Sequence, residues 1–168
     1  DSGHIAMREE VASVAALFKE VKISKPLISS YSDAEITARA VYGAFKDKVG
    51  DDILILVAEG AKQEGAEELS AFEDALRKHL KKSHVATLKG EKKLYKVIKD
   101  IKQDEASRVV LVPLEFIAGE SIENKLSGEY SSMADRLSEE GYTVEMVFKG
   151  LGEYDEFQRL YLRHIYEA

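Results

Sequence analysis

The chain has 168 residues, of which 45% are hydrophobic and 33% are charged, and a formal net charge of −7 at pH 7. This composition is typical of one globular domain of ordinary size, long enough to bury about 70% of the surface that its unfolded form exposes. An acidic chain without a basic stripe is a poor ligand for nucleic acid, and no apolar run approaches the ~20 residues that span a bilayer. The sequence therefore predicts neither nucleic-acid binding nor a membrane anchor.

The chain contains no cysteine, which excludes disulfides, thiolate metal sites and a cysteine nucleophile within it. Since no export signal pattern is seen either, we expect a cytoplasmic protein. Residues 1–6 have the character of a cloning remnant, with Met7 as the expected natural or engineered start. We divide the remainder into a lead-in helix over residues 7–20 and one α/β domain over residues 21–168.

The first half of the chain alternates helical and strand patterns. Residues 8–19 carry apolar side chains at helical spacing, and residues 21–28 form a β-type run that contains a proline. Ser32 and Glu35 form a capping-box pattern, which predicts that a helix begins there and ends near residue 50. Residues 53–58 are continuously apolar, as expected of a strand that is covered on both faces.

The second half continues this alternation and contains a second strongly apolar run. The predicted elements are a helix carrying Leu69, Phe72, Leu76 and Leu80, a short strand over 85–88, a helix over 94–101, a buried strand over 109–114, a short helix within 115–129, a helix from about 133 that ends at Gly141, a strand over 143–148 and a final helix over 153–166. In the final helix, Phe157, Leu160, Tyr161 and Ile165 are expected to face inward.

Strands separated by helices of this length predict a parallel sheet with right-handed crossovers. We expect a three-layer, doubly wound, flavodoxin-like α/β fold with about four to five strands. In an open α/β sheet, ligands bind outside the carboxyl ends of the strands. The turn at Glu59 and Gly60 and the turn at Gly119, Glu120 and Ser121 follow the two apolar runs, so both are predicted to line one site.

Glu59 and Glu120 are the candidate catalytic residues, because two neighbouring carboxylates with perturbed pKa values can shuttle protons or hold a hard cation. The alternative is that both are exposed loop acids. His79, His84 and His164 lie away from the two turns in the predicted topology, so we expect them to be structural or solvated.

Three stretches of the sequence resemble one protein family. They are residues 27–33, residues 56–61 and residues 112–121, the last continuing to the Lys-Gly-Leu-Gly-Glu turn at 149–153. This pattern is similar to the C-terminal half of the anaerobic cobalt chelatases of the CbiK type, class II chelatases that insert cobalt into sirohydrochlorin. The resemblance extends from about residue 8 to residue 165. Its most specific parts are the turn at 149–153 and the Pro-Leu-x-x-x-Ala-Gly turn at 113–119.

The resemblance implies an architecture of two similar domains that face each other across a cleft, of which this chain supplies one. The expected partner is therefore a second chelatase-like domain or a second copy of the chain. The resemblance also implies metal-binding histidines at the positions of Glu59 and Ser121. Neither residue is a histidine, so cobalt is expected by resemblance alone, no metal ligand is assigned, and the cofactor is unknown.

We therefore predict a tetrapyrrole-binding or degenerate chelatase-like half which, if it is active, is a metal chelatase acting on a tetrapyrrole. Ser29, Ser30 and Ser121 would offer hydroxyls, and Gly60 and Gly119 backbone groups, to the acetate or propionate side chains of the macrocycle. The alternative is a flavodoxin-like interaction or assembly domain without catalytic activity.

Overall fold

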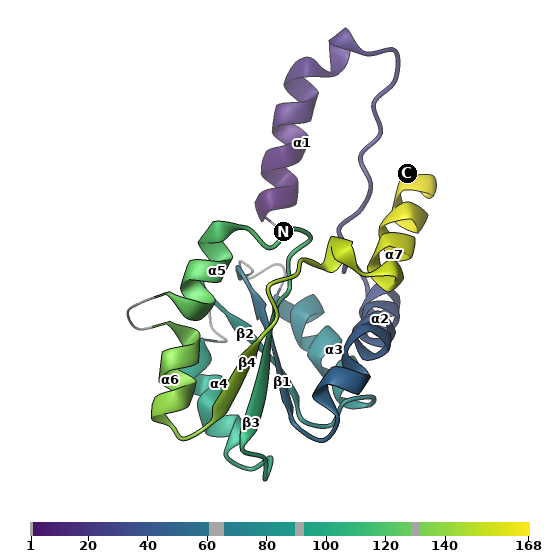
Figure 1. Ribbon diagram of the computed structural model, residues 1–168. Coiled ribbons are helices and arrows are strands. Elements are labelled where there is room, and N and C mark those ends of the chain that lie inside the picture. Colours follow the sequence, from purple (N-terminus) through teal and green to yellow (C-terminus); the bar gives the residue numbers. More distant parts are fainter. Residues whose placement is uncertain (1, 61–65, 90–92, 129–131) are drawn as a thin grey trace.

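The computed structural model describes residues 2–60, 66–89, 93–128 and 132–168, which form a parallel four-stranded sheet covered by helices (Figure 1). The strands are β1 (Ile53–Ala58), β2 (Ser83–Thr87), β3 (Arg108–Pro113) and β4 (Thr143–Met146), in the order β2-β1-β3-β4. Because the chain leaves β1 toward β2 and then crosses back to β3, the sheet is doubly wound. The predicted fold class is confirmed, with four strands in the described part of the chain.

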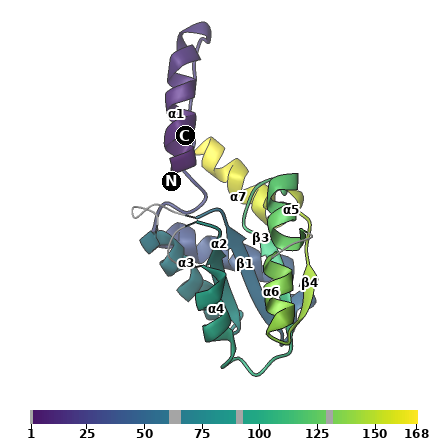
Figure 2. The ribbon, with the colours of Figure 1, turned by 90° about the vertical axis from the view of Figure 1, so that its left-hand side faces the viewer.

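Helices cover both faces of the sheet (Figures 1 and 2). One face carries α2 (Tyr31–Val49), α3 (Ala66–Arg77) and α7 (Asp155–Tyr166). The other carries α4 (Leu94–Ile101), α5 (Glu120–Ser127) and α6 (Met133–Glu139). Two short 3-10 helices, η1 (Ala15–Leu17) and η3 (Leu151–Glu153), and the N-terminal helix α1 (Ser2–Val14) complete the described elements.

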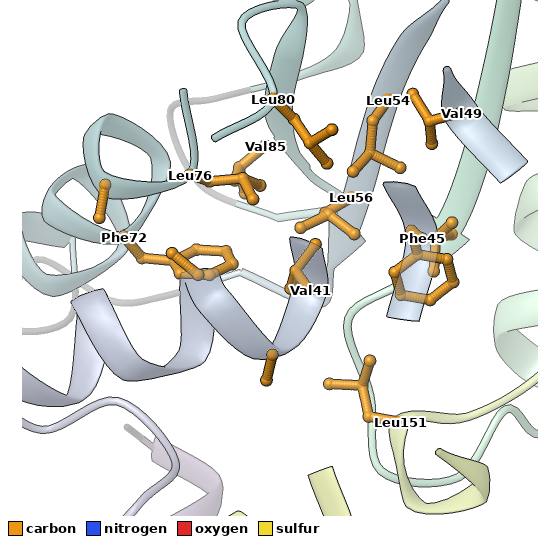
Figure 3. Close-up of a cluster of buried hydrophobic side chains, with 14 of the residues drawn as sticks. Val41, Phe45, Val49, Leu54, Leu56, Phe72, Leu76, Leu80, Val85 and Leu151 are labelled. Atoms are coloured by element: carbon orange, nitrogen blue, oxygen red, sulfur yellow. The ribbon is translucent and has the colours of Figure 1, made fainter. Parts of the chain in front are cut away.

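Strand β1 lies between the two apolar layers, which explains its uninterrupted apolar sequence. Leu54 and Leu56 pack with Phe45 and Phe72 in the layer under α2 and α3 (Figure 3). The alternate side chains of β1 point into the layer under α4, α5 and α6. Each fully buried side chain of this size contributes about 1.5–3 kcal/mol relative to an exposed one, so β1 is the main anchor of the fold.

Two local expectations near the first helix of the body are wrong. Residues 21–28 form no strand, because Pro26 has no amide hydrogen and the segment lies apart from the sheet. The N-cap of α2 is Ser30 rather than Ser32, and the Ser30 side chain accepts a hydrogen bond from the Asp33 amide at 3.1 Å. The predicted N-cap lies two residues too far along the chain. Ser30 and Asp33 have the same spacing as Ser32 and Glu35, so spacing does not distinguish the two pairs.

The buried face of the final helix also differs from the prediction. Phe157 and His164 are buried on α7, while Ile165 is 58% exposed. The spacing from Phe157 through Leu160 and Tyr161 to His164 follows one helical face, and Ile165 lies beyond its edge. A histidine therefore occupies the inward position that the sequence pattern assigned to isoleucine.

Helix α1 projects away from the body of the domain, beyond the carboxyl edge of the sheet (Figures 1 and 2). We call residues 2–24 the N-terminal arm. Several of its large apolar side chains are exposed, with Leu17 at 81% and Phe18 at 61%. Across the described ranges, none of the helices is long and apolar enough to cross a membrane.

The base of the arm is joined to the body by the buried carboxylate of Asp33. Lys25 Nζ lies 2.9 Å from Asp33 Oδ1, and Ser29 Oγ donates to Oδ2 at 2.7 Å. Arg163 and His164 on α7 each place a nitrogen 3.8 Å from Oδ1. Burial would raise the pKa of Asp33, but the hydrogen bonds from Lys25 and Ser29 and the charge of Lys25 outweigh it and lower the pKa from 3.8 to about 2.

The first prediction concerns the acid stability of this junction. Because the pKa of Asp33 is lower in the folded state than its ordinary value of 3.8, its carboxylate stabilises the fold above that pH, and this contribution is lost as the pH falls toward 2. Asp33→Asn should lower the free energy of unfolding by about 2 kcal/mol at neutral pH. The difference from the parent, measured by urea unfolding, should shrink toward pH 2. A difference that is independent of pH would contradict this assignment.

Candidate functional site

The turns that follow β1 and β3 lie side by side at the carboxyl edge of the sheet, as the sequence predicts. Val57 pairs with Pro113 in the register of the two strands. The Leu114 amide continues this pairing and donates to the Val57 carbonyl at 2.7 Å. Since β1 and β3 are neighbours from which the chain winds in opposite directions, this is the switch point where doubly wound folds bind ligands.

Glu59 lies at the centre of this edge and is held by two lysines. Lys89 Nζ donates to Glu59 Oε1 at 2.6 Å, and Lys125 Nζ on α5 lies 3.9 Å from Oε2. The hydrogen bond from Lys89 lowers the pKa of Glu59, assisted by the charges of both lysines. The same bond raises the pKa of Lys89. Glu59 is thus an ionised carboxylate paired with ammonium groups.

Glu115 is the second acid of this site, and our reading of the sequence missed it. It is half-buried directly after β3, where burial raises its pKa, the charge of Glu59 raises it further and the charge of Lys125 opposes the rise. Its backbone carbonyl accepts a hydrogen bond from the Leu151 amide at 2.8 Å. Its position in the sequence could have identified it, because Glu115 is the first acid after the second buried strand.

Glu120, the acid predicted to partner Glu59, is the first residue of α5 and is exposed. A carboxylate in the first turn of a helix is favoured by the helix dipole, which accounts for its position. The electrostatic neighbours of Glu59 are Lys89, Lys125 and Glu115. Besides burial, the charge of Glu59 raises the pKa of Glu115, so these two acids interact at this edge.

The glycines at this edge allow its turns to pack closely. Gly60 has φ +126°, and a Cβ there would lie 2.0 Å from the Lys89 carbonyl oxygen. A Cβ on Gly150 would lie 2.3 Å from the Phe116 carbonyl oxygen. Gly119, by contrast, has open space around it. Two of the three turns are therefore fixed against their neighbours, which holds Lys89 and Glu115 in place.

The predicted ligand-binding serines divide between two regions. Ser29 and Ser30 lie at the start of α2, where the Ser29 hydroxyl donates to the carboxylate of Asp33 and the Ser30 hydroxyl accepts from its amide. Their hydroxyls are therefore engaged with the junction of the arm and the body. Ser121 belongs to the first turn of α5, at the same edge as Glu59.

The three histidines of the body lie away from Glu59 and its two lysines. His79 is exposed and stacks at 5.6 Å from Tyr42. His84 is buried at the amino end of β2, where Arg77 donates to Nδ1 at 2.8 Å and Nε2 lies 2.5 Å from Asp104. Since guanidinium only donates, the Nε2 proton faces Asp104. His164 lies beside Asp33.

The described ranges contain no group of three or more His, Cys, Asp or Glu side chains arranged to hold a metal ion. At the carboxyl edge, the cations next to Glu59 are instead the two lysine ammonium groups.

Comparison of the sequence with known proteins gives one family over nearly the whole chain. The profile of the family described as Cobalt chelatase (CbiK) matches residues 4–168. The sirohydrochlorin cobaltochelatase CbiKC of Nitratidesulfovibrio vulgaris strain Hildenborough is 23% identical over 165 residues, which cover 94% of this chain and 58% of that protein. The chain thus spans less than two thirds of the length of this curated relative.

Two solved structures illustrate the similarity of fold. SirB from Bacillus subtilis, in a structure with Fe³⁺, matches with a TM-score of 0.62 and 18% identity, covering 96% of this chain and 64% of SirB. A cobalamin biosynthesis CbiX protein from Marinobacter aquaeolei VT8 matches with a TM-score of 0.53 and 20% identity, covering 68% of this chain and 92% of that protein. At these identities the matches show a shared fold.

The second prediction tests the packing of the turns. Gly60→Ala should destabilise the protein by about 2 kcal/mol or more, since the new Cβ meets the Lys89 carbonyl and the backbone has a positive φ. The matched control is Gly119→Ala, which has open space and negative φ and should cost less than about 1 kcal/mol, as expected of a changed N-cap. Urea unfolding measures both. Equal losses for the two variants would show that the turns are not tightly packed.

Proposed function

The chain belongs to the cobalt chelatase (CbiK) family, and from this premise we propose that it is a tetrapyrrole-binding, degenerate half of a chelatase. The proposed ligand is sirohydrochlorin or a related macrocycle, the substrate named for the curated relative. The proposed binding position is the carboxyl edge of the sheet, at the turns after β1 and β3. The absence of cysteine supports the further proposal that binding takes place in the reducing cytoplasm.

One observation carries the degenerate part of this proposal: Glu59 is already neutralised by lysines. Cobalt and nickel favour imidazole ligands, whereas this edge offers a carboxylate that accepts a hydrogen bond from Lys89 at 2.6 Å. A metal ion that approached Glu59 would have to displace Lys89 and would face the charge of Lys125. Metal insertion also needs bases that accept the pyrrole N–H protons, and an ion-paired carboxylate of lowered pKa is a poor base.

The third prediction separates binding from metal insertion. Titration with sirohydrochlorin should give a saturable shift of its absorbance spectrum. Added Co²⁺ should be inserted at the same rate with and without the protein, because Glu59 is held by Lys89. If the protein accelerates insertion, the chain is an active chelatase and the degenerate assignment is wrong. If the protein shifts the absorbance spectrum of no macrocycle, tetrapyrrole binding itself is excluded.

Three variants locate the binding position in the same titration. Glu59→Ala should alter the affinity for the macrocycle, because it removes the carboxylate at the centre of the edge. Glu120→Ala tests the exposed acid that the sequence pattern singled out. Glu139→Ala is the matched control, an exposed acid at the end of α6, and should leave the affinity unchanged.

We also propose that the N-terminal arm packs against a second chelatase-like domain, supplied by a second copy when this chain is alone. The arm exposes five large apolar side chains: Met7, Val14, Leu17, Phe18 and Val21. The body exposes further apolar side chains next to the carboxyl edge, including Phe116 and Ile117. Apolar surface of this kind on both parts favours association.

The fourth prediction tests this partner. The chain should sediment as a concentration-dependent dimer, and Phe18→Lys should shift it to monomer because a charge then replaces a 61% exposed aromatic ring of the arm. Lys19→Ala is the control on the same segment and should leave the dimer intact. A monomer at all concentrations would exclude the second copy as the partner.

The second candidate function is a flavodoxin-like interaction or assembly domain without small-molecule chemistry. The exposed apolar side chains of the arm are the observation that favours it. Dimerisation through the arm together with no macrocycle binding would select this function.

A further inference from the structure

Three charged side chains from three elements meet at the carboxyl edge of the sheet. Glu59 follows β1, Lys89 follows β2 and Lys125 lies in α5. Glu59 Oε1 accepts from Lys89 at 2.6 Å, while Glu59 Oε2 lies 3.9 Å from Lys125 Nζ. One carboxylate is therefore shared by two ammonium groups, and the trio carries an excess of one positive charge in a chain whose net charge is −7.

The lysines retain hydrogen-bonding capacity toward the solvent side. An ammonium group has three donors. Lys89 gives one to Glu59 and its side chain is 77% exposed, and the 3.9 Å separation of Lys125 from Glu59 is too long for a hydrogen bond. By contrast, Lys102 at the end of α4 forms an ordinary pair with one carboxylate, Glu140, at 2.8 Å.

Stability alone does not account for this arrangement. An exposed ion pair contributes about 0–1 kcal/mol, and holding two long lysine side chains at one carboxylate costs side-chain entropy. The close packing of Gly60 on the Lys89 backbone fixes where Lys89 leaves the main chain, directly beside Glu59. The positions of the cations are thus set by the fold at the point where a ligand would bind.

We propose that Lys89 and Lys125 form a carboxylate-binding subsite that recognises an acetate or propionate side chain of a tetrapyrrole. This inference rests on the proposed function and adds to it the atoms that would recognise the macrocycle. Charge-assisted hydrogen bonds from ammonium to carboxylate are about twice as strong as neutral ones. Glu59 acts as a positioning residue that keeps both ammonium groups at the edge.

Glu115 provides a second test, in which the expected change in affinity has the opposite sign to that of the lysine variants. It lies two residues beyond the end of β3, directly after Leu114, whose amide donates to the Val57 carbonyl of β1 at 2.7 Å. When it is ionised, its negative charge opposes an incoming carboxylate. Replacing Glu115 by glutamine keeps the shape and removes that charge, so carboxylate binding should become tighter.

The fifth prediction is the experiment on this subsite, with two ligands: sirohydrochlorin and its fully esterified form, which keeps the ring and lacks the carboxylates. Lys89→Ala should weaken sirohydrochlorin binding about tenfold, and the double variant with Lys125→Ala about 100-fold. Glu115→Gln should tighten it several-fold. The esterified ligand should bind all of these proteins with the same affinity. Lys102→Ala, the control, should bind both ligands as the parent does.

The outcomes distinguish the subsite from the function on which it rests. If the parent protein binds neither ligand, the proposed function is wrong and the subsite falls with it. If the parent binds sirohydrochlorin but the lysine variants bind it equally well, the proposed function stands and the subsite is wrong. Both lysines are exposed, and an unchanged circular dichroism spectrum establishes that the variants are folded. Lys89→Arg, which retains the charge, should keep most of the affinity.

Discussion

The pairing of β1 with β2 on one side and β3 on the other is the constraint on which the rest of this structure depends. All side chains of β1 except that of Ala58 are buried. They alternate between the two apolar layers, so the strand has one register and one direction. That register brings the ends of three strands to a common edge, and each carries a charged residue there: Glu59, Lys89 and Glu115. The chemistry of the edge is therefore a consequence of the core beneath it.

Close packing between turns then converts this edge from a set of loops into a defined arrangement of charges. Gly60 contacts the backbone of Lys89, and Gly150 contacts the backbone of Phe116, at distances that no Cβ tolerates. Of the two turns that the family resemblance marks as most specific, close approach of main chains explains Gly150, whereas Gly119 has open space around it. The resulting cluster is a carboxylate with two ammonium neighbours and a half-buried acid of raised pKa, and it is the arrangement on which the proposed carboxylate-binding subsite rests.

The arm and the body differ in how much of their apolar surface is covered. The body has a buried apolar core and exposes some large side chains, such as Phe116 and Ile117, whereas Leu17 and Phe18 on the arm are both mostly exposed. The junction between them depends on Asp33, a buried carboxylate that Lys25 and Ser29 satisfy. The arm extends away from the body at this junction (Figure 1), and the partner proposed for it is a second chelatase-like domain.

Local patterns in the sequence determined the order of helices and strands and the doubly wound class, because the continuous apolar run of a central strand and the helical spacing of its neighbours are properties of short segments. The tertiary structure alone decided which charges meet. Glu115, which the sequence pattern did not single out, is an acid whose pKa is raised by burial and by the charge of Glu59, Lys89 lies against Glu59 from 30 residues away, and His164 rather than Ile165 faces inward. Contacts between distant parts of the chain decide which side chains become partners, which face of a helix turns inward and whether an extended segment such as residues 21–28 joins the sheet. Spacing within one segment carries no information about these contacts.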